Sequence, residues 1–220
     1  TWPAPARAAA FRRGEAIWLL FDATGQINLN GVTRAGRRHE DIEVVRGQGV
    51  IGLRIPAPAD VQVSARTDDN SWVFTLGARA DNRAAAPTQR DSTADGHGRL
   101  TANFGRDGVV RQINDPEIGD QITVALLGGP ALGIDTRRAT IEAALLPAAH
   151  GAVIETRADG VTAAFQNGQL VVSRGDAGLV AAAPPTPQAA ADAANSNASA
   201  LAEAISGDDS TQGSGDPTMS

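Results

Sequence analysis

Residues 152–174, AVIETRADGVTAAFQNGQLVVSR, hold three short, mostly apolar runs separated by two Asx-Gly pairs. Asp159-Gly160 and Asn167-Gly168 are typical of two-residue hairpin turns, because both central residues of a type I′ turn need positive φ angles. Together the two turns predict a three-stranded antiparallel meander. The stretch therefore indicates a β protein.

Strand patterns also dominate the N-terminal part of the chain. Short runs that are rich in β-branched or aromatic residues, and bounded by Gly, Pro, Asp or Asn, predict strands. They lie at residues 16–21, 25–29, 42–46, 49–55, 60–66 and 71–76. Pro56 and Pro58 separate two of these runs, as expected for a residue that cannot donate to a ladder.

A weak internal repeat supports the same interpretation. Residues 9–18, AAFRRGEAIW, and 163–172, AAFQNGQLVV, share the form A-A-F-x-x-G-x followed by mostly apolar residues. Residues 102–110, ANFGRDGVV, are similar with one residue inserted. Each predicts a strand, a tight turn at Gly and a return strand, so a duplicated module is possible.

The remaining segments are less regular. Residues 137–146, RRATIEAALL, fit a helical face about as well as a strand. Residues 77–98 lack apolar periodicity and predict a long loop. Beyond residue 181 small and polar residues prevail, which predicts disorder because little apolar area can be buried.

These patterns predict a mainly β fold, either an antiparallel, hairpin-built sandwich or two small β modules, with a disordered C-terminal tail. The expected organisation is a first β module at 1–78, a linker at 79–98, a second β module at 99–181 and an acidic tail at 182–220.

Composition excludes several functions. The 220-residue chain has no Cys, which removes disulfides and thiolate chemistry, and its 19 basic residues are all Arg, which removes a lysine Schiff base. All 19 Arg and 20 of the 25 acids precede residue 182, whereas the tail holds five acids and no base. Without a basic stripe we expect no nucleic-acid partner, and without a long apolar run we expect no membrane span.

One apparent cofactor motif is better explained as a turn. Gly47-x-Gly49-x-x-Gly52 follows a strand-like run, as in a dinucleotide-binding fingerprint, but that mechanism needs a helix after the last Gly. Pro56 and Pro58 forbid a continuous helix there. The motif therefore predicts a Gly-rich turn between two strands and no cofactor. The Gly128-Gly129-Pro130 run likewise predicts a β-turn.

The ionisable residues show no catalytic pattern. His39, His97 and His150 lie in no metal-binding motif, so we expect neither a metal site nor a cofactor. Two pairs of acidic residues could serve a glycosidase, Asp68 with Asp69 and Asp115 with Glu117. Both pairs lie in turn-like sequences, where Asp is expected for conformational reasons alone. A glycan-active hydrolase with a carboxylate pair is the alternative function.

Four residues are candidates for binding a partner. Arg34, Arg37 and Arg38 form a local basic patch next to Glu40 and Asp41, which is either a solvated loop or an anion contact. Trp2 lies in a Pro/Ala-rich lead-in and is a candidate for docking. Trp18 and Trp72 lie within strand runs and are expected in the core.

Three stretches resemble a known group of proteins: AAFRRGEAIWLLFD at 9–22, DPEIGDQITV at 115–124 and LLPAAHGAVIETRADGVTAAF at 145–165. They resemble the β-rich, AMIN-like N-terminal regions of tetratricopeptide-repeat proteins of the alphaproteobacterial envelope. The resemblance implies an exported module without catalytic residues, placed before a helical repeat array. We therefore expect a structural module of a cell-envelope scaffold, in the periplasm or envelope, that binds a protein or peptidoglycan.

Overall fold

The computed structural model describes residues 6–29, 42–69, 71–77, 84–92, 97–175 and 178–180. All of them belong to one structural unit, residues 1–181. They form sixteen strands, and no helix occurs among them. The expectation of a mainly β, antiparallel, hairpin-built fold is confirmed. The tail at 182–220, with its predicted disorder, lies outside the described residues.

The strands form four sheets. The first has the order β13-β1-β2-β4-β3 and contains β1 (Ala8–Arg13), β2 (Ala16–Phe21), β3 (Glu43–Gly47), β4 (Val50–Pro56) and β13 (Ala148–His150). The second has the order β11-β12-β14-β10-β9 and contains β9 (Val109–Asn114), β10 (Gln121–Leu126), β11 (Arg138–Ala139), β12 (Ala143–Leu146) and β14 (Ala152–Thr156). The third has the order β15-β16-β8-β7 and contains β7 (Thr88–Ser92), β8 (Gly98–Asn103), β15 (Thr162–Gln166) and β16 (Gln169–Ser173). The fourth is the hairpin of β5 (Gln62–Asp68) and β6 (Ser71–Gly77).

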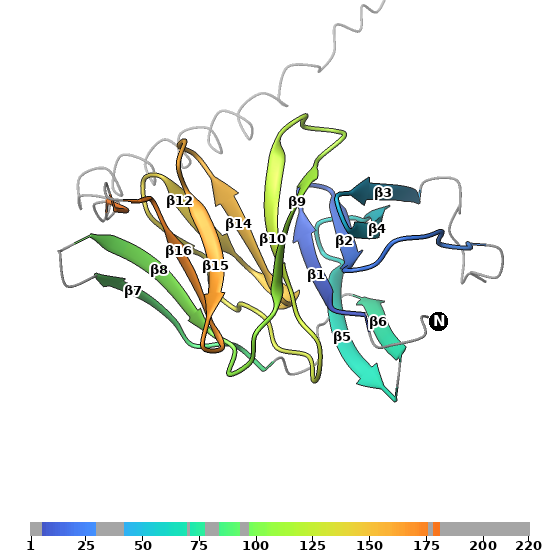
Figure 1. The fold of residues 1–220 in the computed structure, drawn as a ribbon. Coiled ribbons are helices and arrows are strands. Elements are labelled where there is room, and N and C mark those ends of the chain that lie inside the picture. The colour runs from blue at the N-terminus through green and yellow to red at the C-terminus, as the bar shows by residue number, and fades with distance from the viewer. Residues whose placement is uncertain are drawn as a thin grey trace, which may run out of the picture. The chain divides into compact units, whose positions relative to one another are not determined.

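Three apolar cores join these sheets into four layers, in the order fourth, first, second and third (Figure 1). Between the first and second sheets, Trp18 packs with Ile122 and Val124. Between the second and third, Ile154 packs with Leu170. The layer order explains why the two inner sheets are covered on both faces.

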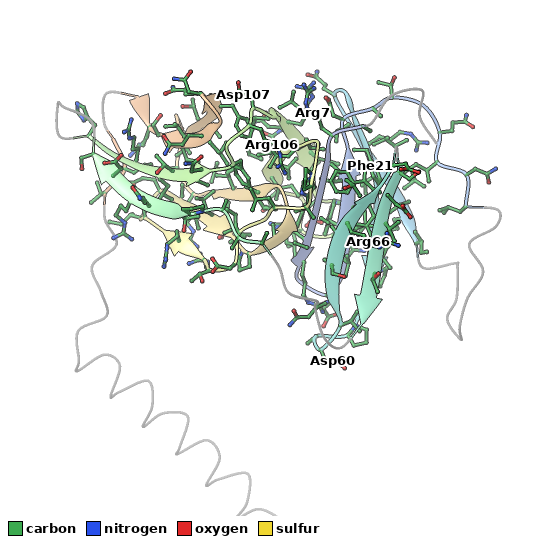
Figure 2. All side chains as sticks on the ribbon, turned by 90° about the horizontal axis from the view of Figure 1, so that it is seen from below. Arg7, Phe21, Asp60, Arg66, Arg106 and Asp107 are labelled. Atoms are coloured by element: carbon green, nitrogen blue, oxygen red, sulfur yellow. The ribbon has the colours of Figure 1, made fainter. Side chains whose placement is uncertain are left out.

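The outermost core lies between the first sheet and the β5–β6 hairpin. Ile17 and Phe21 reach it from the face of β2 opposite to Trp18. Phe21, labelled in Figure 2, meets Phe74 of β6 edge to face, with 5.9 Å between ring centroids. A two-stranded sheet is marginal alone, so this contact and its neighbours hold the hairpin in place.

Burial on both faces accounts for the composition of the inner strands. All six residues of β2, AIWLLF, are buried, as are the last five of β10. Strands covered on both faces consist of near-continuous apolar runs, whereas strands covered on one face alternate. The outer strand β15 does alternate, with Ala163 and Phe165 half-buried and their neighbours exposed.

Residues 137–146 contain two short strands, β11 and β12, and no helix, which decides between the two open alternatives. β11 and β12 pair with each other, and β12 pairs with β14. Pro147 then separates β12 from β13, which leaves the second sheet and pairs with β1 of the first. β13, which lies between β12 and β14 in the chain, therefore forms an outer strand of the first sheet. The N-terminal and C-terminal parts of the unit share that sheet.

The predicted meander is wrong in one respect. The turn at Asn167-Gly168 is a two-residue hairpin that joins β15 and β16, and both residues have positive φ (52° and 79°). The turn at Asp159-Gly160 instead leads from β14 in the second sheet to β15 in the third. β15 cannot pair with β14, because β14 is already paired on both sides, by β10 and β12.

Two other local expectations differ from the structure. Residues 25–29 form no strand and belong to none of the four sheets. Within the segment expected to be a loop, residues 88–92 form β7, which pairs with β8 through polar residues. A polar outer strand gives no apolar periodicity from which it could be recognised.

The internal repeat is partly confirmed. Residues 9–18 and 163–172 both form hairpins, β1–β2 and β15–β16. The third copy, residues 102–110, does not, because β8 and β9 belong to different sheets.

Candidate functional site

The residues predicted to bind a partner lie outside the described part of the chain. Arg34, Arg37 and Arg38 fall within residues 30–41, and Trp2 falls within residues 1–5. Their role stays a prediction. The other two Trp are described: Trp18 is buried, as expected, and Trp72 is half-buried with its indole N–H donating to the carbonyl of Ala6 at 2.8 Å.

His150 is a buried structural residue. Its Nδ1 accepts from the backbone N–H of Leu132 at 3.1 Å, and its Nε2 lies 3.0 Å from the carbonyl of Leu127. These partners require the neutral tautomer with the proton on Nε2. Burial lowers the pKa of His150 to about 4. The Trp72 ring lies 4.3 Å away, so the imidazole joins three segments.

Metal ligands do not gather in the described ranges. His39 lies outside them, and among the residues that are described no group of three or more His, Asp and Glu side chains could hold a metal ion. His97 and His150 are therefore not part of such a group.

Of the two carboxylate pairs considered for hydrolysis, Asp68-Asp69 lies at the exposed turn between β5 and β6, whereas Asp115 and Glu117 have structural partners. Asp115, whose side chain is 3% exposed, pairs with Arg13 and accepts the backbone N–H of Glu117 at 3.0 Å. Glu117 pairs with Arg54, which also contacts Glu43 at 3.3 Å. Both arginines lie in the first sheet, so the two ion pairs fasten the β9–β10 loop to it.

The Gly-rich motif is the turn between β3 and β4, as expected. Gly47 pairs with Val50, which leaves Gln48 and Gly49 as the turn, and Gly49 has a φ of 70°. Gly52 lies within β4, where a Cβ would fall 2.3 Å from the carbonyl of Leu19. The glycines therefore serve the hairpin and its close packing.

A groove lies where the terminal strands of three sheets meet. β3, β9 and β15 are each the last strand of their sheet, and β9 contacts both of the others. The groove has a volume of about 1100 Å³. We call it the β9 groove; its walls are residues 46–49, 110–114 and 161–163, together with Gln121 and Thr123.

The walls of the β9 groove are polar and cationic. Two cross-strand pairs, Gln112 with Thr123 and Asn114 with Gln121, share one face of the β9–β10 hairpin. Among the described wall residues, the charged ones are Arg46 and Arg111. Arg46 is exposed and has no ion pair within the described residues. The groove is therefore locally positive in a chain of net charge −6.

Arg111 is partly neutralised and fixed in position. Its Nη2 lies 2.9 Å from Oδ1 of Asp22, whose other oxygen meets Arg7 at 3.3 Å. Its Nη1 donates to the carbonyl of Val110 at 3.3 Å. Asp22 follows β2, so this contact connects the first sheet with the β9 edge.

The phase of the β9–β10 ladder shows which backbone groups face the groove. Asp115 N–H donates to the carbonyl of Asp120 at 2.8 Å, and Asn114 pairs with Gln121 next to it. Since antiparallel residues alternate between bonded and non-bonded pairs, the backbone groups of Val110, Gln112 and Asn114 point away from β10. All three residues line the groove.

The β9 groove was not predicted from the sequence, because no motif marks it. Residues 109–114, VVRQIN, have the pattern of an ordinary strand, and nothing local shows that the strand is unpaired on one side. The alternation of Arg111 and Ile113 with Gln112 and Asn114 is a weak signal, since it indicates one face turned away from an apolar core.

Comparison of the chain with protein-family models, with curated proteins and with solved structures returned no match. Within the described ranges, no helix has the length and apolar character needed to cross a membrane.

Proposed function

We propose that this chain is a non-catalytic interaction module of a bacterial cell-envelope scaffold, and that it holds a protein or peptidoglycan partner in the β9 groove. The observation that carries the proposal is the groove itself, with an exposed Arg46 and an edge of β9 to which no described strand is paired. The scaffold and its envelope location rest on the sequence resemblance.

The layered fold supports a binding role. Exposed strand edges are sites at which another chain can pair, and most proteins cover or interrupt them. Here three terminal strands from three layers border one groove, and the cores beneath them hold their positions. A rigid groove loses little conformational entropy on binding, which favours affinity.

The hydrolase alternative has no comparable support. A glycosidase needs two carboxyl groups that converge on a substrate, roughly 5–10 Å apart. Asp115 and Glu117 are each engaged with an arginine of the first sheet, and neither lines the β9 groove. We therefore propose the binding function alone.

Site-specific photo-crosslinking tests the proposal. A benzophenone amino acid replaces Gln48, an exposed wall residue, or Arg66, an exposed residue of β5 that Figure 2 labels. Each variant is illuminated with envelope proteins and with purified peptidoglycan sacculi. We expect a discrete adduct from position 48 and none from position 66. Equal labelling from both positions, or none from position 48, would contradict the proposal.

A further inference from the structure

We infer that the partner segment is an extended, acidic peptide that adds to the free edge of β9 as a further strand. This inference rests on the proposed binding function and specifies its ligand. Three observations carry it: the unpaired backbone donors of β9, the size of the groove and the charge of its walls.

The outer edge of β9 offers backbone donors. The N–H groups of Val110, Gln112 and Asn114 point into the groove and have no backbone partner within the described ranges. The carbonyl of Val110 is bonded to Arg111, and the carbonyl of Gln112 faces Gly47, where a Cβ would lie 2.9 Å away. The free edge is therefore rich in donors, and the carbonyls of an added strand are their natural acceptors.

The groove has room for a peptide. Its volume of about 1100 Å³ exceeds the roughly 300–1,000 Å³ that is typical of small-molecule pockets. The six residues of β9 span about 20 Å at roughly 3.3 Å per residue. The β3–β4 turn bounds this edge on one side and the start of β15 on the other, so a strand of similar length would be flanked by both.

The charges favour an acidic ligand. Among the described residues, Arg46 and Arg111 are the charged residues of the groove wall; Asp22 holds Arg111 at 2.9 Å, whereas Arg46 has no ion pair there. Guanidinium groups bind carboxylates through paired hydrogen bonds, which suits Asp or Glu side chains. Arg46 is therefore the main partner for an acidic side chain of the added strand, and Arg111, which Asp22 partly neutralises, adds less charge.

Peptide selection on the whole chain tests the inference. A random twelve-residue peptide library is displayed and selected against the full 220-residue chain and against Arg46→Glu. We expect enrichment of Asp and Glu with the original chain, and at least about tenfold weaker binding of the selected peptides to Arg46→Glu. No enrichment, or enrichment of basic peptides by the original chain, would overturn the inference.

Two proline variants test strand addition itself. Gln112→Pro removes an outward N–H without breaking a bond to β10, because this residue donates nothing to β10, and Gln112→Ala is the matched control that keeps the N–H. We expect Gln112→Pro to weaken the selected peptide at least about tenfold and Gln112→Ala to weaken it less than about threefold. Equal effects, or loss of binding only in Ala163→Pro on the β15 edge, would overturn addition to β9. Far-UV circular dichroism confirms that each variant is folded.

A sacculus-binding assay separates the two levels of the proposal. Retention of the chain by peptidoglycan, together with no peptide selection, would overturn the acidic-peptide inference and leave the binding module standing. Absence of sacculus binding, peptide selection and crosslinking at position 48 would overturn both.

Discussion

His150 shows how one buried side chain joins segments that are distant in sequence. It accepts from Leu132, lies in hydrogen-bonding distance of the carbonyl of Leu127 and contacts the ring of Trp72. The sequence marked it only as one of three histidines without a motif. Its structural role follows from the position of β13, which no local pattern predicts.

The lowered pKa of His150 predicts a loss of stability in acid. Below the unfolded-state pKa of 6.5 the unfolded chain binds a proton that the folded chain does not bind until about pH 4. The free energy of unfolding should therefore fall as pH drops through this range, by up to about 3 kcal/mol from this group.

The variant His150→Gln isolates this effect, because glutamine does not titrate. Urea unfolding of both proteins at pH 7 and pH 4.5 gives the measurement. We expect the original chain to lose about 2 kcal/mol more than the variant between the two pH values. An equal loss in both proteins would show that His150 does not contribute.

Two glycines test the close approach of the layers. Gly151 has a φ of 72°, and a Cβ on it would lie 2.4 Å from the carbonyl of Ala125. Gly14 has a φ of 56° but nothing within 4 Å of a Cβ. We expect Gly14→Ala to cost about 1 kcal/mol through its backbone conformation alone. Gly151→Ala should cost clearly more, as measured by urea unfolding, and similar costs would contradict the packing argument.

At the level of elements, the same sequence repeat produces two different turns. In β1–β2 the two-residue turn is Gly14-Glu15, with positive φ at Gly14 alone, whereas Asn167 and Gly168 both have positive φ. These are the features of type II′ and type I′ turns. The repeat therefore predicts a hairpin correctly but not the register, which differs by one residue relative to the Gly.

The ion pair between Arg13 and Asp115 connects β1 to the β9–β10 loop, and both side chains are largely buried. Breaking a buried pair leaves an uncompensated charge, so Arg13→Gln should lower the free energy of unfolding by about 3 kcal/mol. Adding Asp115→Asn should recover much of this loss, since the amide oxygen can still accept the N–H of Glu117. Urea unfolding of the single and double variants is the measurement.

Arg66→Gln is the matched control for this prediction. Arg66 pairs with Asp68 at 3.4 Å, but both side chains are more than 60% exposed. Exposed pairs are screened by solvent, so we expect a change of less than about 1 kcal/mol. Equal losses from Arg13→Gln and Arg66→Gln would contradict the structural role of the buried pair.

At the scale of the whole molecule, β13 makes the first sheet depend on both halves of the unit. It comes from the segment expected to be a second module, yet it pairs with β1. Leu127 and Ala8 are also joined by a pair of backbone hydrogen bonds, at 2.8 and 2.9 Å. The described layers therefore share their sheets and cores across the expected boundary.

Shared layers predict one cooperative unfolding transition for this unit. All three Trp lie in residues 1–78, so their fluorescence reports on the first half, whereas far-UV circular dichroism reports on every strand. We expect urea unfolding curves from the two signals to coincide. Phe165→Trp adds a fluorescent reporter in the third sheet. In this variant the unfolding midpoints from fluorescence and from circular dichroism should again be equal. Two separate transitions would instead support two independent modules.

Local sequence patterns were sufficient to predict the class of the fold, most strands and several turns. Asn167-Gly168 and the two-sided apolar run at 16–21 act locally, through turn conformation and burial, so they can be recognised without knowledge of the neighbours. Pro147 likewise marked the end of a strand that could not be told from a helix by periodicity.

The pairing of the strands, and therefore the position of the β9 groove, became apparent from the three-dimensional structure alone. Asp159-Gly160 has the same local chemistry as Asn167-Gly168, yet β14 is already paired on both sides and the chain must continue to another sheet. The free edge of β9 also depends on pairing, because β9 has a free edge only if no described strand pairs with its outer side. Pairing depends on burial across layers that are distant in sequence, and no local pattern encodes it.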